Sequence, residues 1–170
     1  NLALKADGGV VGWGDTGNGF GEATLPPGIS NVVAVSAGYG FSLVIRPNLP
    51  PQAMPLRVAA AANRDIVITL TATDPDKDAL SFKISSLPSN GSLYQCVSGT
   101  RGAAITSTNT VVNNAGGQVV YAPATGGYGN PYTTFGFVAN DGEVLSTAAT
   151  VTIVVGLPYT FTQAATKIRP

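Results

Sequence analysis

The chain has 170 residues, of which 44% are apolar and 11% are charged, and nine basic and nine acidic side chains give it a formal charge of zero. The apolar fraction is sufficient for a packed core. No Lys/Arg cluster reaches the density that a phosphate backbone requires, so we expect no nucleic-acid partner. No run approaches the ~18 apolar residues of a membrane span, so we expect no membrane insertion. Abundant Gly, Ala, Thr and Val favour strands and turns throughout.

Residues suited to metal binding and nucleophilic catalysis are scarce, because the sequence has no histidine and a single cysteine, Cys96. A Cys/His zinc site, an internal disulfide and a serine hydrolase with a histidine base are therefore excluded. Paired-carboxylate glycosidases hold two acids across a cleft, whereas the acids here cluster on one loop. We predict that the protein is not an enzyme and that Cys96 is a small buried hydrophobe.

The first 46 residues alternate short apolar runs with glycine-rich turns. Their blocks resemble one repeat of the regulator-of-chromosome-condensation propeller family, at residues 3–15, 19–21, 31–38 and 41–43. The resemblance implies a propeller-type β-repeat, with Trp13 buried between blades. A single repeat cannot close a propeller, so we expect it to pack against earlier repeats, the adjacent domain or another copy.

Residues 47–62 are rich in proline and predict a linker. Pro47, Pro50, Pro51 and Pro55 cannot donate to a sheet ladder and favour an extended polyproline conformation. We expect a semi-rigid spacer there. No segment of the chain shows a sustained helical stripe, although Ala59–Ala62 is compatible with a single helical turn.

Residues 63–156 show the alternation of half-buried strands. Ile66, Ile68, Leu70 and Ala72 fall on one face of a strand, and apolar side chains alternate with polar ones over 80–85. Further candidate strands lie at 92–96, 117–122, 134–139 and 149–155, separated by turns such as Asn90-Gly91, Gly126-Gly127 and Asp141-Gly142. About seven short strands in roughly 100 residues predict a two-sheet sandwich.

Five blocks in this region resemble the cadherin-like, immunoglobulin-like tandem repeat of large bacterial surface and secreted proteins. The resemblance covers about residues 60–156, through blocks at 73–82, 87–93, 120–123, 135–142 and 146–153. It implies an all-β, immunoglobulin/cadherin-like antiparallel sandwich in an extracellular or cell-surface protein. It further implies adhesive or structural work, often with bound Ca²⁺. Lys77 departs from the family pattern, and its charge would weaken cation binding.

Three carboxylates stand within five residues, at Asp74, Asp76 and Asp78. Acids this close repel one another unless a cation lies among them, and oxygen-only ligands favour Ca²⁺. An immunoglobulin-like topology would bring Asn140 and Asp141, at the end of a later strand, to the same pole. The predicted metal site therefore consists of Asp74, Asp76, Asp78, Asn140 and Asp141, with Ca²⁺ in a structural role. The alternative is a solvated turn in which aspartates accept hydrogen bonds from their own backbone.

The last segment, 157–170, is predicted to be an extended tail or a connector. Tyr159 and Phe161 alternate with Thr160 and Thr162, as in a strand that could add to the open sheet edge of another copy. The chain starts at Asn1 without a methionine, so we expect a processed subunit or an excerpt of a longer protein.

The leading hypothesis is a non-catalytic extracellular module of a bacterial surface protein or fibre. It would polymerise by strand addition through its termini and be stabilised by Ca²⁺, with other copies or neighbouring repeats as partners. One alternative is an adhesin stalk whose units follow covalently. The other is a carbohydrate-recognition module in which Tyr128, Tyr132 or Tyr39 stacks on sugar rings.

Overall fold

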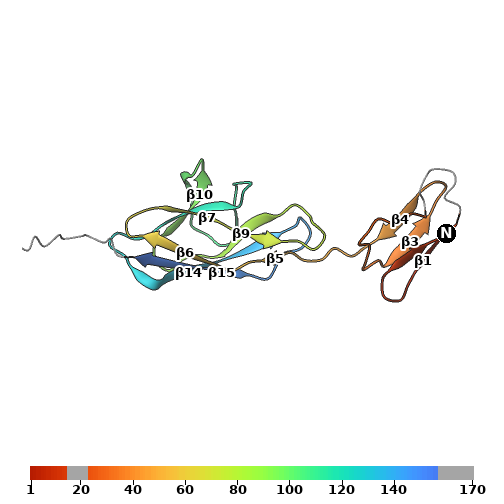
Figure 1. Ribbon diagram of the computed structural model, residues 1–170. Coiled ribbons are helices and arrows are strands. Elements are labelled where there is room, and N and C mark those ends of the chain that lie inside the picture. Colours follow the sequence, from red (N-terminus) through yellow and green to blue (C-terminus); the bar gives the residue numbers. More distant parts are fainter. Residues whose placement is uncertain (15–22, 157–170) are drawn as a thin grey trace, which may run out of the picture. The chain divides into compact units, whose positions relative to one another are not determined.

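The computed structural model describes residues 1–14 and 23–156, and these ranges contain strands and turns but no α-helix. The chain divides into unit 1, Asn1–Asn48, and unit 2, Leu49–Pro170 (Figure 1). The all-β class predicted from composition is thereby confirmed for the described residues.

Unit 1 consists of two antiparallel strand pairs. The first joins β1 (Leu2–Leu4) to β2 (Val10–Gly12), and the second joins β3 (Ala34–Ala37) to β4 (Ser42–Ile45). β1 lies against β3. A backbone bond of 3.0 Å from Val32 N to Gly8 O ties the two pairs together. The similarity of this unit to a propeller repeat stays a prediction.

Unit 2 is a sandwich of a four-stranded and a five-stranded sheet, with one short additional pair (Figure 1). Its strands are β5 (Gln52–Ala53), β6 (Leu56–Ala61), β7 (Ile66–Thr69), β8 (Ala72–Thr73), β9 (Ser81–Ser86), β10 (Ser92–Val97), β11 (Thr100–Ile105), β12 (Thr110–Val111), β13 (Gln118–Ala122), β14 (Gly129–Asn140) and β15 (Ala149–Gly156). The sheets have the orders β11-β10-β13-β7 and β12-β9-β14-β15-β6, and β5 pairs with β8. β6 runs parallel to β15, and all other pairs are antiparallel.

The core of unit 2 lies between the two sheets. Its largest side chains are at most 2% exposed and come from both sheets: Ile84, Phe135, Phe137, Val151 and Ile153 from one, and Ile68, Leu93, Val119 and Tyr121 from the other. The rings of Phe82 and Phe137 lie 6.0 Å apart at 58°, a tilted aromatic contact. Burying each such side chain stabilises the fold by about 1.5–3 kcal/mol. Cys96 is buried, as predicted.

Each segment predicted as a strand in unit 2 contains one, but the predicted linker at 47–62 is wrong. Residues 52–53 form β5 and residues 56–61 form β6, which pairs with β15. Ala59–Ala61 are therefore extended and do not form a helical turn. Pro55 lies between the two strands, so the prolines flank pairing segments without interrupting one. The boundary between the units falls at Asn48.

The loop 87–91 is held firmly against the ends of β13 and β14. The Tyr121 hydroxyl donates to the Asn90 carbonyl at 2.7 Å, and burial raises the pKa of Tyr121 well above its usual value. Gly91 has φ of 74°, and a Cβ there would lie 2.4 Å from the Tyr121 hydroxyl, so glycine is required. The buried Thr133 hydroxyl accepts from Ser89 N at 3.1 Å and Asn90 N at 3.4 Å. These bonds fix the position of the loop.

Thr133→Val tests this anchor, because it removes the acceptor and leaves two loop N–H groups without it. We expect the free energy of unfolding, measured by urea denaturation, to fall by about 1–3 kcal/mol. Thr134→Val is the matched control, because Thr134 is exposed at the next position of the same strand and should change stability by less than about 0.5 kcal/mol. Equal losses in the two variants would contradict the anchor.

Candidate functional site

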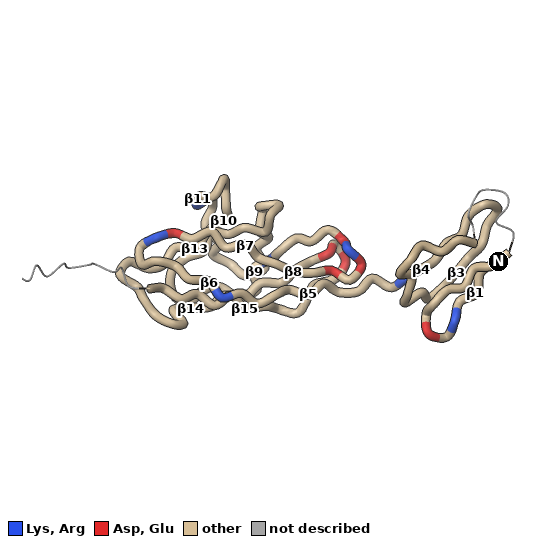
Figure 2. The backbone as a smooth tube through the Cα atoms, viewed as in Figure 1, with Lys and Arg blue, Asp and Glu red and all other residues tan. Residues whose placement is uncertain are grey.

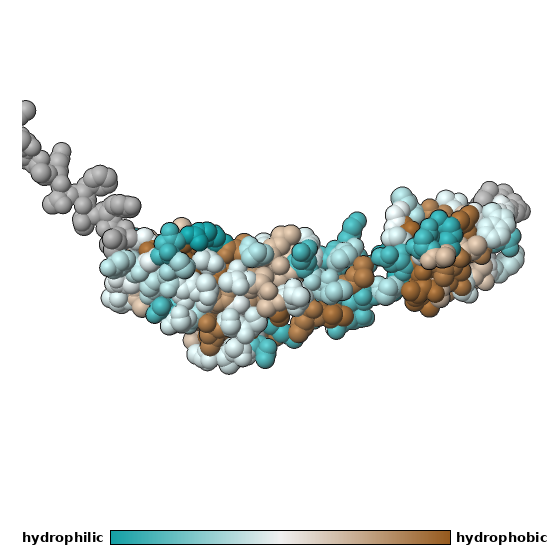
Figure 3. Space-filling model, turned by 90° about the horizontal axis from the view of Figure 1, so that it is seen from below, coloured by the Kyte–Doolittle hydropathy of each residue, from teal (hydrophilic) through white to brown (hydrophobic). Residues whose placement is uncertain are grey.

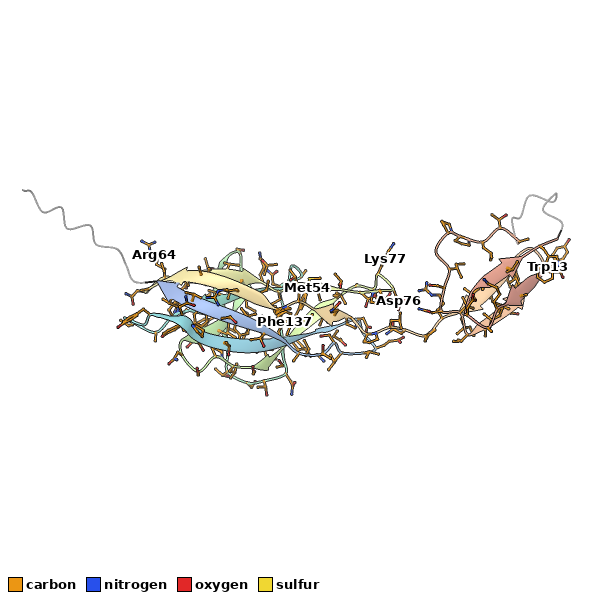
Figure 4. All side chains as sticks on the ribbon, turned by 60° about the horizontal axis from the view of Figure 1, so that its bottom comes forward. Trp13, Met54, Arg64, Asp76, Lys77 and Phe137 are labelled. Carbon is orange, nitrogen blue, oxygen red and sulfur yellow. The ribbon has the colours of Figure 1, made fainter. Side chains whose placement is uncertain are left out.

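The loop between β8 and β9 carries the predicted acidic cluster (Figure 2). Asp74 Oδ1 accepts hydrogen bonds from Asp76 N at 2.8 Å and Asp78 N at 3.1 Å. Lys77 has φ of 67°, and its side chain points away from the sandwich (Figure 4). The other oxygen of Asp74, Oδ2, is buried and has no hydrogen-bond partner. The Asp74 carboxylate thus fixes the turn by accepting hydrogen bonds from two backbone N–H groups of the same loop.

Asp76 performs a second structural task. Its Oδ2 accepts from Leu49 N at 2.8 Å, where unit 2 begins. This bond ties the amino-terminal end of unit 2 to the acidic loop, because the two residues are 27 positions apart in sequence.

Asn140 and Asp141 lie at the same end of the sandwich as the acidic loop. Asn140 pairs with Ser81, the first residue of β9, and the Ser81 hydroxyl donates to Asn140 O at 3.3 Å. Asp141 Oδ1 accepts from Glu143 N at 2.8 Å and Val144 N at 2.7 Å. The topology that the sequence predicted does bring the two loops to one pole, and each loop is folded around an aspartate.

The metal site predicted at Asp74, Asp76, Asp78, Asn140 and Asp141 stays a prediction. Within residues 1–14 and 23–156, no group of three His, Cys, Asp or Glu side chains is placed to hold a metal ion. Asp74 and Asp141 each use one carboxylate oxygen to accept two backbone N–H groups, as the alternative of a solvated turn expects. The hydrogen bonds to Asp74 Oδ1 and Asp141 Oδ1 account for the turns, whereas the buried Asp74 Oδ2 has no hydrogen-bond partner.

A cavity of about 280 Å³ lies beside the carboxyl-terminal end of β11. Its walls come from the anchored loop, from the start of β10 and from the end of β11, and they include Leu87, Pro88, Leu93, Tyr94, Ile105 and Thr106. No charged side chain lines it. The cavity has no signal in the sequence, because β11 shows little apolar alternation and is not among the predicted strands.

β11 is an edge strand with an irregular ladder. It pairs with β10 only, and the register shifts between Tyr94 and Cys96. Gly102 lies at this irregularity, where a Cβ would approach Val97 Cγ2 to 2.8 Å and Gln95 O to 3.0 Å. Beyond it, Ala103 and Ala104 are exposed at the open edge of the sheet. The cavity and an unpaired strand edge are therefore adjacent.

Charge is confined to the other end of β11. Arg101 forms an ion pair with Asp65 through both carboxylate oxygens, and its guanidinium carbon lies 4.9 Å from the Tyr94 ring centroid. The hydrogen bond from Arg101 lowers the pKa of Asp65 below its usual value. Both side chains are partly exposed, so solvent screens the pair and its contribution to stability is small.

The tyrosines predicted to bind sugar do not line this cavity. Tyr39, in unit 1, is 98% exposed, and Tyr128, in unit 2, is 62% exposed, whereas Tyr132 is half-buried against the core. The carbohydrate-recognition alternative stays a prediction.

Comparisons with known proteins concern mainly unit 2. Residues 53–155 match the family described as a SibA-like, immunoglobulin-like domain. One solved structure that matches is the crystal structure of Dscam1 isoform 4.44, N-terminal four Ig domains, with 13% sequence identity and a TM-score of 0.33. The match covers 71% of this chain and 31% of that chain. No curated protein matches the sequence. In the part of the chain that the structure describes, no helix could cross a membrane.

The ion pair at β11 predicts a pH effect. In Arg101→Gln the pKa of Asp65 should rise toward its ordinary value of 3.8. Because the folded-state pKa is lowered, the pair stabilises the fold above the unfolded pKa, and that stability is lost as pH falls through the folded pKa. NMR titration of the Asp65 carboxyl carbon measures the shift, with Arg57→Gln as a control that leaves this pair intact. An unchanged pKa in Arg101→Gln would rule out the pair.

Proposed function

This chain belongs to the SibA-like, immunoglobulin-like domain family, and on that premise we propose that it is a non-catalytic, extracellular structural module of a bacterial surface protein or fibre. The module works by associating with other copies of itself or with neighbouring repeats. Its association surfaces are the apolar face of unit 1 and the open sheet edges of unit 2.

The observation that carries this proposal is the unburied apolar surface of unit 1. Among the described residues of unit 1, Val32 is the one buried large apolar side chain. Eight others are exposed, namely Leu4, Val11, Trp13, Val33, Tyr39, Phe41, Leu43 and Ile45. Figure 3 shows hydrophobic residues gathered on the visible face of this unit, and in Figure 4 Trp13 projects from its surface. Exposed apolar surface of this extent is typical of an interaction site.

The hairpin of β3 and β4 shows how this surface is built. Leu43 and Ile45 alternate with Ser42 and Val44, and both are more than half exposed. Each would contribute about 1.5–3 kcal/mol if a partner covered it. A unit of 48 residues with so small a core is not expected to be stable alone. Its partner is therefore another apolar β-surface, as a propeller-type repeat would provide.

Unit 2 offers the second means of association. Its sheets end at four open edges, on β11, β7, β12 and β6. Open edges expose backbone N–H and C=O groups that can pair with an added strand. This supports polymerisation by strand addition, with the segment 157–170 as the donor.

Light scattering on the 170-residue chain tests the proposal. We expect the mass to exceed 17.2 kDa and to rise with concentration. Leu43→Glu combined with Ile45→Glu should shift the distribution toward the monomer, because the partner would bury two unpaired charges. Thr24→Glu with Ser30→Glu is the matched control, since both positions are exposed and polar. A wild-type chain that remains monodisperse at 17.2 kDa would contradict polymerisation and favour the adhesin stalk.

Stabilisation by Ca²⁺ at the acidic pole is a separate part of this proposal. If the ion binds there, we expect CaCl₂ added to EDTA-treated protein to raise the melting temperature. At a free Ca²⁺ concentration of 100 times the Kd, binding adds about 2.7 kcal/mol to the free energy of unfolding. Asp76→Ala should lose this response, while Glu143→Ala, at an exposed acid outside the predicted ligands, should keep it. A wild-type melting temperature that does not respond to Ca²⁺ would contradict Ca²⁺ binding at this pole.

A further inference from the structure

The end of β11 is a sheet edge without protecting charges. Residues 103–106 carry no charge and no proline, the features that usually protect an edge from pairing. By contrast, β12 has two residues and β6 carries Arg57. β7 is uncharged as well, but the cavity described above is lined by β11 and not by β7, so we take the end of β11 as the acceptor.

The cavity beside this edge is of the right size and polarity for a side chain. Its volume of about 280 Å³ falls just below the range of about 300–1,000 Å³ in which small-molecule sites are found. Leu87, Leu93 and Ile105 make it apolar. An open strand edge that supplies backbone pairing, next to a pocket that takes one side chain, is the arrangement by which sheets recognise extended peptides.

We propose that residues 103–106 and the adjoining cavity accept the segment Tyr159–Thr162 of a second copy as an additional strand, with an aromatic side chain in the cavity. This inference rests on the assembly proposed above and names its acceptor surface. In a strand, Tyr159 and Phe161 point to one face and Thr160 and Thr162 to the other. The segment is uncharged, as is the edge that receives it.

The donor comes from a second copy, because Tyr159–Thr162 follows β15 too closely in sequence to reach β11 of the same copy. Gly156 ends β15, which is two strands from β9 and in the sheet opposite β11. Two strand spacings of about 4.8 Å along one sheet and one sheet spacing of about 10 Å across the core give a diagonal of about 14 Å. About four to five extended residues are needed to span it. The residues needed for the crossing overlap with Tyr159–Thr162, so they could not also pair with β11. The segment of a neighbouring copy is therefore the donor.

A photo-crosslinker placed in the tail tests the proposal directly. The variant Phe161→p-benzoylphenylalanine keeps an aromatic ring at the donor position, and it is mixed with ¹⁵N-labelled chain so that crosslinks between copies are recognised by mass. We expect ¹⁵N peptides containing residues 87–94 or 103–106. In labelled Ala104→Glu the yield should fall at least about tenfold, because a buried unpaired charge opposes pairing. Thr69→Glu, exposed on β7 at the opposite edge of the same sheet, is the matched control.

The outcomes separate this inference from the assembly on which it rests. Crosslinks between copies that map to β7, β6, β12 or unit 1 would overturn the acceptor while leaving assembly intact. Crosslinks at β11 that occur only within one copy would overturn the second-copy donor. Scattering at the monomer mass, with no crosslinks between copies, would overturn both.

Discussion

The constraint on which the structure of unit 2 depends is that two sheets bury one core between them but neither sheet closes on itself. Side chains such as Ile84 and Phe137 from one sheet and Leu93 and Val119 from the other are fully buried, so the sandwich is stable as a pair of layers. Each sheet nevertheless ends in strands that are paired on one side only. The core of this fold is fully buried while its sheet edges stay open, and open edges are where another strand can pair.

Local pattern was enough to predict the central strands. The segments that form β7, β9 and β15 have an apolar residue at every second position, because one face of each strand packs against the core. The peripheral strands β6 and β11 were missed for the opposite reason. They lie at edges, contain alanine and glycine, and bury few side chains, so their pairing depends on neighbours that the local sequence does not identify. Three prolines precede β5 and Pro55 separates β5 from β6, so proline content there marks the ends of short strands and a change of partner strand.

The candidate sites show the same division. The sequence predicted that the Asp74 loop and Asp141 share a pole, and the pairing of Asn140 with Ser81 agrees. Whether their carboxylates converge depends on side-chain hydrogen bonding, and Asp74 and Asp141 are both engaged by nearby backbone N–H groups. The cavity at β11 has no local signature, because its walls come from separate segments that only the folded sandwich brings together.

Hydrogen–deuterium exchange at β11, followed as the chain is concentrated, tests the central claim most directly. The account predicts that those amides of residues 103–106 that are not bonded to β10 exchange rapidly in dilute solution and become protected as copies associate, while the amides of β7 are unaffected. Association that proceeds while β11 keeps its exchange rates would contradict the claim that this edge receives the added strand.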